Sequence, residues 1–169
     1  MSKNFYLSIF FGFFFNVILG QNPIEWITNT EKINDSTYNL TTTAKIENNW
    51  RLYSQYNEEG GAILTEFIFS DSLIIKNYSK VVEPEPITKF DPVFNLDQSY
   101  FVNQVTFNQR IVLSDNDVDF VNQTVYYQVC DDRVCIFQEQ DLMFNLSGIS
   151  NLNKTCLLYT SDAADDSGC

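Results

Sequence analysis

The sequence predicts an all-β protein built as an antiparallel β-sandwich, and two observations carry this prediction. After residue 20, no stretch keeps an apolar 3.6-residue period over three helical turns. Short runs that alternate apolar and polar residues recur instead, and residues with turn chemistry separate them. Six to eight short strands at this spacing are typical of two antiparallel sheets that pack face to face.

The alternation is carried by seven runs. They are residues 37–47, 50–54, 63–70, 72–79, 104–114, 123–130 and 141–147. In the first run, one face carries Tyr38, Leu40, Ala44 and Ile46, and in the fifth it carries Val105, Phe107, Ile111 and Leu113. In the sixth run, Val125, Tyr127 and Val129 share one face, and Tyr126, Gln128 and Cys130 share the other. Strands of this kind are half-buried, with the apolar face toward the core.

Turn chemistry separates these runs at Asn48-Asn49, Glu59-Gly60-Gly61, Ser70-Asp71 and residues 114–117. Residues 81–100 are the exception, because they alternate poorly and hold three of the four prolines. A loop of this length inside a compact domain is usually functional or disordered. The sequence therefore predicts a long loop over residues 81–100, with a role in function.

The two ends of the chain are predicted to lie outside the folded domain. Lys3 and the apolar run 5–19 are typical of a secretory signal peptide, which we expect over residues 1–20. Residues 156–169 follow neither period and resemble the translation of a sequencing adapter, so we interpret them as an artefactual tail after a truncated gene fragment. One domain, residues 21–155, remains. Export would place its cysteines in an oxidising compartment.

Composition excludes several classes of function. The formal net charge is −12, and such an acidic surface would repel nucleic acid, so we expect no nucleic-acid partner. The chain contains no histidine, which excludes Ser-His and Cys-His nucleophilic catalysis. Zinc sites take four ligands, and two thiols without an imidazole do not supply them. With no glycine-rich phosphate loop in the sequence either, we expect neither a metal nor a cofactor.

Cys130 and Cys135 form the cysteine pair of the domain, within the segment YYQVCDDRVCIFQ. They flank the turn DDRV of an expected hairpin, and they are either a structural staple or a working redox couple. A disulfide that closes so small a ring stabilises the fold by only about 2 kcal/mol in the chain-entropy estimate. Strain in a small ring also makes the bond easier to reduce. The spacing alone leaves both interpretations open.

Several segments flank this pair in a recognisable order: WRLYSQ, GGAILTEFIFS, KFDPVF, FNQRI, YYQVCDDRVC and LMFNL. In their order and spacing, residues 26–147 resemble the N-terminal periplasmic domain of the thiol:disulfide interchange protein DsbD, in the form seen in Bacteroidetes-like bacteria. The resemblance implies an immunoglobulin-like sandwich whose two cysteines shuttle between dithiol and disulfide. Two features depart from the family. Residues 136–138 replace prolines that often follow the second cysteine, and the membrane-spanning and C-terminal portions are missing.

The resemblance also implies a cover over the disulfide. In this family an aromatic residue on a flexible loop shields the two sulfurs and moves aside for partners. By its position in KFDPVFNLDQSY, Phe94 is our candidate for that cap, with Phe90 as the second candidate. Asp91 is expected to help shape the loop. Tyr53, in the segment WRLYS, is expected in the same pocket.

The two cysteines are expected to have different roles in exchange, which passes through a mixed disulfide. Cys130 ends a strand and should be the more enclosed sulfur, whereas Cys135 leaves the turn and should be open to a partner. Cys135 would then form the intermolecular bond and Cys130 would resolve it, as in the resembling family. Asp131 and Asp132 are expected to raise the pKa of both thiols, and Arg133 to oppose them.

For the whole molecule, the resemblance implies a carrier in the periplasm. It would receive electrons from the membrane and C-terminal portions of a full-length protein, and pass them to thioredoxin-like partners. Disulfide isomerases and cytochrome c maturation factors are the partners known for the family. The alternative function is a secreted β-sandwich binding or adhesion module in which the hairpin disulfide is purely structural.

Overall fold

The computed structural model describes residues 22–147 except residues 93 and 116. Within these residues all regular secondary structure is β, and none of it is a helix that could cross a bilayer. The strands are β1 (Ile24–Lys32), β2 (Thr37–Ile46), β3 (Arg51–Tyr53), β4 (Glu66–Phe69), β5 (Ile75–Tyr78), β6 (Ile87–Asp91), β7 (Leu96–Phe101), β8 (Gln104–Leu113), β9 (Phe120–Cys130) and β10 (Cys135–Asn145). The predicted all-β class is confirmed. The expected signal peptide and tail lie outside the described residues.

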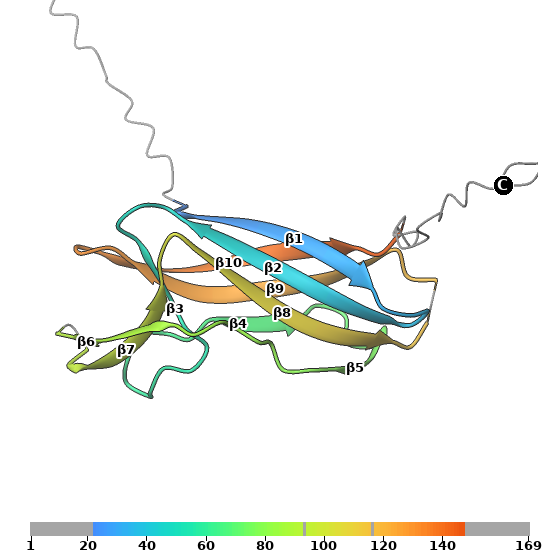
Figure 1. Ribbon diagram of the computed structural model, residues 1–169, viewed down its shortest axis with the longest axis horizontal. Coiled ribbons are helices and arrows are strands. Elements are labelled where there is room, and N and C mark those ends of the chain that lie inside the picture. The colour runs from blue at the N-terminus through green and yellow to red at the C-terminus, as the bar shows by residue number, and fades with distance from the viewer. Residues whose placement is uncertain (1–21, 93, 116, 148–169) are drawn as a thin grey trace, which may run out of the picture.

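The strands form two antiparallel sheets that pack face to face (Figure 1). The first sheet has the order β1-β2-β8-β5, and the second has the order β10-β9-β3-β7-β6. Strand β4 pairs with the middle of β9, and β3 pairs with its last residues, so the two short strands share one edge of β9. Two antiparallel sheets in this arrangement make the immunoglobulin-like sandwich that the resemblance implies.

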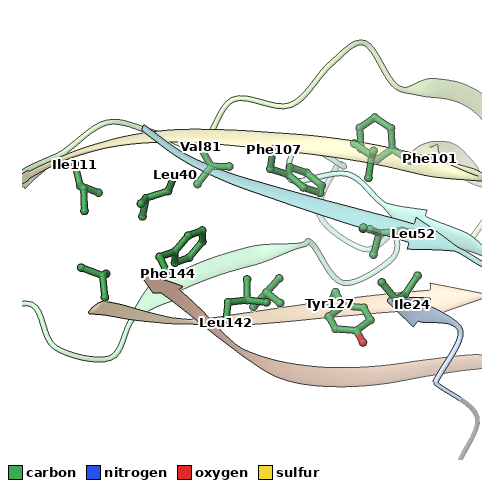
Figure 2. Close-up of a cluster of buried hydrophobic side chains, with 14 of the residues drawn as sticks. Ile24, Leu40, Leu52, Val81, Phe101, Phe107, Ile111, Tyr127, Leu142 and Phe144 are labelled. Carbon is green, nitrogen blue, oxygen red and sulfur yellow. The ribbon is translucent and has the colours of Figure 1, made fainter. Parts of the chain in front are cut away.

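The core lies between the sheets and is built by the alternation present in the sequence. In β2 and β8, every second side chain is buried. Figure 2 shows Leu40 and Phe107 of the first sheet in one layer, above Tyr127, Leu142 and Phe144 of the second. Full burial of such a side chain contributes about 1.5–3 kcal/mol, so this cluster is the main source of stability.

The structure corrects the loop predicted over residues 81–100. Strands β6 and β7 pair there as an antiparallel hairpin at the edge of the second sheet. The alternation is hidden in the sequence, because β6 exposes nearly all of its side chains and β7 buries Gln98 at an inward position. The prediction was therefore wrong for the two strands, whereas residues 81–86, with only an isolated bridge at Val82, and the turn between the strands match it.

Two other strands differ from the prediction. Strand β1 has no counterpart among the predicted runs, because it is an edge strand in which only Ile24 is fully buried. The predicted run 141–147 is part of a longer strand, because β10 pairs continuously with β9 from Cys135 to Asn145. The described residues thus contain ten strands where six to eight were expected.

Candidate functional site

The β9–β10 hairpin brings the two cysteines together. Cys130 is the last residue of β9 and Cys135 the first of β10, and the two are direct register partners. They form a disulfide with an S–S distance of 2.03 Å and a Cα–Cα distance of 4.1 Å. The pair therefore closes the hairpin at the point where its strands end.

Asp131 organises the turn between the cysteines. Its carboxylate oxygen Oδ1 accepts the backbone N–H groups of Arg133 and Val134, each at 2.7 Å. Its own N–H donates to the carbonyl of Val134 at 3.0 Å. These backbone donors lower the pKa of the Asp131 carboxyl. An aspartate that bonds its own backbone a few residues ahead is a standard way to close a tight turn.

The two sulfurs differ in their exposure, as the sequence predicts. Cys130 is 2% exposed and packs with Tyr53 and Ala62, whereas Cys135 is exposed. Cys130, at the end of β9, packs in a buried cluster, whereas Cys135, at the start of β10, follows the exposed turn. An incoming group can therefore reach Cys135 more easily than Cys130.

The turn of the β6–β7 hairpin brings the predicted cap residues to the same end of the sandwich (Figure 1). Phe94 packs against the Tyr53–Ala62–Cys130 cluster, with its ring centroid 6.1 Å from that of Tyr53 and edge-on to it. The Tyr53 hydroxyl donates to Asp91 Oδ2 at 3.4 Å. All three line one pocket of about 340 Å³ with the two cysteines. Phe90 also lines it but is 61% exposed.

Tyr53 is the most perturbed titratable side chain of this pocket. Burial, reinforced by the negative charge of Asp91, raises the pKa of Tyr53 to about 12. The phenol therefore stays protonated over any physiological range of pH and acts as a hydrogen-bond donor to the Asp91 carboxylate. This pair fixes the β6–β7 turn relative to β3.

Arg51 is a member of the site that the sequence reasoning missed. Its Nη2 atom lies 2.6 Å from Asp132 Oδ1, and its guanidinium carbon lies 5.8 Å from the ring centroid of Tyr100. In the sheet, Arg51 is the register partner of Cys130. The partner aspartate is 81 residues away, so no local pattern predicts the ion pair. One feature of the sequence could have indicated Arg51: it lies two residues before Tyr53 on the same short strand, so both side chains fall on one face.

Asp132 is consequently not the unpaired charge that the sequence implied. The Arg51 guanidinium opposes its charge, and the backbone N–H groups of the turn stabilise that of Asp131. Arg51 thus joins Arg133 as a cation beside the two aspartates: Arg51 pairs with Asp132, and the charges of both arginines help to lower the pKa of Asp131.

The loop before β4 forms the wall behind Cys130, and two buried glutamines hold it. Gln98 accepts the N–H of Ala62 at 2.9 Å, and Gln128 accepts the N–H of Ile63 at 2.6 Å. Gly61 fits here because a Cβ at this position would collide with the Gln98 amide. The amide nitrogen of Gln128 lies 3.6 Å from the sulfur of Cys130. The alternation in the sequence places Gln128 on the same face as Cys130, but the contacts of Gln128 and the presence of Gln98 were not expected.

A larger cavity of about 660 Å³ lies between β1 and β10, lined by Trp26, Lys45 and Met143 among others. It contains neither cysteine. Among the described residues, no three His, Cys, Asp or Glu side chains cluster as ligands for a metal ion would. The disulfide pocket is therefore the place where reactive groups converge.

The model of one protein family, the N-terminal region of the thiol:disulfide interchange protein DsbD, matches residues 25–147. The chain belongs to this family. The match includes the whole hairpin with Cys130 and Cys135, and also Tyr53, Asp91 and Phe94. A search of curated proteins gives no significant match.

Several solved structures are similar to this chain. The N-terminal periplasmic domain of ScsB from Proteus mirabilis is similar with a TM-score of 0.53 at 17% identity, over 73% of this chain and 45% of that chain. This chain thus covers less than half of that one. The reduced DsbD N-terminal domain from Neisseria meningitidis gives 0.44 at 14% identity, over 74% and 84% of the two chains. The complex of the DsbD and PilB N-terminal domains from that organism gives 0.41 at 11%, over 73% and 83%.

The arrangement in this DsbD-family chain is chemically competent for thiol–disulfide exchange. Exchange needs a sulfur that a thiolate can reach and a second sulfur that can leave as a thiolate. Cys135 meets the first requirement by its exposure, and Cys130 lies beside an amide donor that meets the second.

Proposed function

We propose that the domain is a thiol–disulfide carrier, in which the Cys130–Cys135 pair cycles between dithiol and disulfide. The observation that carries the proposal is the asymmetry of the pair, with one buried and one exposed sulfur at the tip of a hairpin. A purely structural bond gains nothing from an exposed sulfur. Membership of the DsbD family supports the same function.

In the exchange step, the thiolate of a reduced thioredoxin-like protein attacks Cys135 Sγ. A sulfur–sulfur bond forms between the partner and Cys135, the Cys130–Cys135 bond breaks, and its electron pair leaves on Cys130 Sγ. The partner's second thiolate then attacks the partner's sulfur in the mixed disulfide. The bond to Cys135 breaks, and Cys135 leaves as a thiolate, which completes the reduction of the pair. Delivery of electrons follows the same steps in reverse, with Cys135 as the attacking thiolate and Cys130 as the resolving one.

Phe94 would act as a cap on the pair, with Tyr53 and Asp91 holding its turn. The ring packs against the cluster that contains Cys130, and it sits on the turn of a hairpin at the sheet edge, where movement costs few core contacts. A cover of this kind would protect the reduced thiols from small oxidants. A docking partner would displace it.

The compartment and partners of this proposal follow from the family. The ScsB domain is described as periplasmic, and we place this chain there as well. Its electron donor would be the membrane and C-terminal portions of a longer protein, and its acceptors would be thioredoxin-like proteins. The proposal includes no metal or cofactor, because both sulfurs belong to the chain.

The test is to trap the mixed disulfide with single-cysteine variants. Cys156 and Cys169 are first replaced by Ser, so that the pair supplies every thiol. Cys130→Ser should then accumulate a stable mixed disulfide with a thioredoxin-like protein whose single active thiol has been activated as a thionitrobenzoate disulfide. Cys135→Ser should trap little, because its remaining sulfur is buried. Gel shift under non-reducing conditions measures both.

Two outcomes would contradict the proposal. Equal trapping by the two variants would mean that the assignment of roles is wrong. Trapping by neither, combined with a wild-type disulfide that resists a thioredoxin-like reductant and stabilises the fold, would identify the pair as a staple. The binding or adhesion module would then be the better interpretation.

A further inference from the structure

A buried amide faces the sulfur that must leave as a thiolate. Gln128 precedes Cys130 by two residues on β9, so both side chains lie on the same face of the sheet. Its Nε2 atom is 3.6 Å from Cys130 Sγ, within hydrogen-bond reach for a sulfur acceptor. Gln128 is 9% exposed and Cys130 is 2% exposed, so water has little access to this contact.

The backbone fixes the orientation of this amide. The side-chain oxygen Oε1 of Gln128 accepts the N–H of Ile63 at 2.6 Å, which leaves the NH₂ end of the same amide directed at the sulfur of Cys130. The neighbouring residue Ala62 is held by Gln98, and Thr65 donates to the carbonyl of Tyr53 at 2.5 Å. Both ends of the loop are therefore anchored, and the donor is positioned before any reaction begins.

We propose that Gln128 is a catalytic residue that donates a hydrogen bond to the thiolate formed on Cys130. The proposal rests on the proposed function for the direction of attack. When a partner thiolate bonds to Cys135 Sγ, the electron pair of the broken disulfide goes to Cys130 Sγ, which gains a full negative charge. No proton moves in this step, because the amide hydrogen stays on nitrogen.

The contact strengthens as the charge develops. A disulfide sulfur is a weak acceptor, whereas a thiolate is an anion, and hydrogen bonds to charged groups are about twice as strong as neutral ones. A buried thiolate without a donor would carry the full cost of lost solvation. A pre-positioned donor that acts chiefly on the charged state lowers the barrier rather than merely binding the resting state.

Other charged and titratable groups surround the pair, but their contacts lead elsewhere. They are Arg51 and Tyr53 of β3, Lys89 and Asp91 of β6, Tyr100 of β7, and Asp131, Asp132 and Arg133 of the turn. Arg51 is paired with Asp132, and the Tyr53 hydroxyl donates to Asp91. Substitution of Gln128 leaves all of these in place, so its effect on Cys130 can be measured separately.

The experiment titrates Cys130 as the single thiol of the full chain, in a background with Cys135, Cys156 and Cys169 replaced by Ser. Carbon-13 labelling of the cysteine Cβ lets nuclear magnetic resonance follow the protonation of this buried sulfur without alkylation. Gln128→Met removes the donor at similar volume, and Gln128→Glu replaces it with an oxygen. The pKa of the Cys130 thiol should rise in the order Gln128, Met, Glu.

Gln98→Met is the matched control. Gln98 also accepts a loop N–H, but its amide nitrogen donates to the carbonyl of Asp97 and not to a sulfur. It should lower stability and leave the Cys130 titration unchanged. If Gln98→Met shifts the titration as far as Gln128→Met does, packing of the loop sets the pKa and the proposal is wrong. If one Gln128 variant fails to fold, the other still shows whether the pKa of the Cys130 thiol rises.

A second measurement uses the chain with its disulfide intact and dithiothreitol as the reductant. Gln128→Met should slow reduction about tenfold, the equivalent of losing one hydrogen bond to a charged group. An unchanged rate together with an unchanged titration would overturn the proposal. Neither readout needs a protein partner, so both remain informative if trapping fails and the carrier function is rejected.

Discussion

The core of the sandwich and its disulfide end are built from different interactions. In β2 and β8, eight of the ten buried side chains are apolar, Thr42 and Gln109 being the others, and the apolar ones meet across the sheets (Figure 2). At the disulfide end the buried side chains include the polar residues Ser54, Thr65, Gln98 and Gln128. Each of these has a hydrogen-bond partner, and Ser54 bonds the Glu83 carboxylate.

This difference separates stability from chemistry. Apolar burial is non-directional, so it gives the core a large free energy but no means of controlling a sulfur. Hydrogen bonds contribute little net stability but fix direction and charge. The core therefore holds the hairpin in place, and the polar end determines how its sulfurs react. Substitutions in the two regions should move different observables.

The largest expected effect is a loss of stability in the core. Phe107 is 1% exposed, and its ring centroid lies 5.1 Å from that of Phe67 and 6.0 Å from that of Phe101. Phe107→Ala should lower the free energy of unfolding by about 3–5 kcal/mol, because it removes the ring and leaves a cavity. The rate of disulfide reduction per folded molecule should stay unchanged. Urea denaturation and a stopped reduction assay measure the two quantities.

Phe120→Ala is the control for this prediction, because Phe120 begins β9 of the other sheet and is 51% exposed. Its stability should change by no more than about 0.5 kcal/mol. If Phe107→Ala alters the reduction rate of the folded protein, the core and the disulfide end are coupled. The separation of the two regions would then not hold.

The same difference explains what the sequence could predict of the fold. Alternation identified β2, β8 and β9, because most of their inward residues are apolar. It failed for β6, where nearly all side chains are exposed, and for β7, where one of the two buried residues is Gln98. A strand that is held by polar contacts at a sheet edge leaves no period-two signal.

For the site, the order of segments in the sequence was enough to bring Tyr53, Asp91 and Phe94 to the cysteine pair. The geometry places all three around one pocket. Arg51 and Gln128 could not be predicted, because their contacts join residues far apart or depend on the direction of an amide. Side-chain hydrogen bonds of this kind become visible only when the backbone path is known.

The second prediction concerns the cap and is intermediate in size. Phe94→Ala should lower stability by about 1 kcal/mol, because the ring is only partly buried. Alkylation of the reduced Cys135 thiol should become faster, because the side chain that packs beside the pair is gone. Timed alkylation followed by mass spectrometry gives the rate, and thermal unfolding gives the stability.

Phe90→Ala is the matched control, because Phe90 precedes the same turn but is 61% exposed. It should change neither quantity appreciably. A large loss of stability in Phe94→Ala with an unchanged alkylation rate would make Phe94 an ordinary core residue. Apolar packing would then hold the disulfide end together, as it does the core.

The smallest expected effect appears only at alkaline pH, and it tests whether the polar end contributes to stability through charge. Burial first, and then the Asp91 carboxylate, raises the pKa of Tyr53 from 10.0 to about 12. In the unfolded chain the phenol loses its proton near the ordinary value, whereas in the folded protein it keeps the proton for longer. The folded state thus binds more protons than the unfolded state between these two values, so stability falls as the pH rises through this window.

Tyr53→Phe removes this titration. Its urea midpoint should therefore decline less between pH 10 and pH 12 than that of the wild type, although both share every other alkaline transition. Asp91→Asn keeps the burial of Tyr53 and removes the neighbouring charge, so its slope should lie between the two. Below pH 10 the contribution of Tyr53 is complete, and the three curves should run parallel. Equal slopes above pH 10 would mean that the phenol gains nothing from its place beside Asp91, and that only apolar packing holds the cap turn to β3.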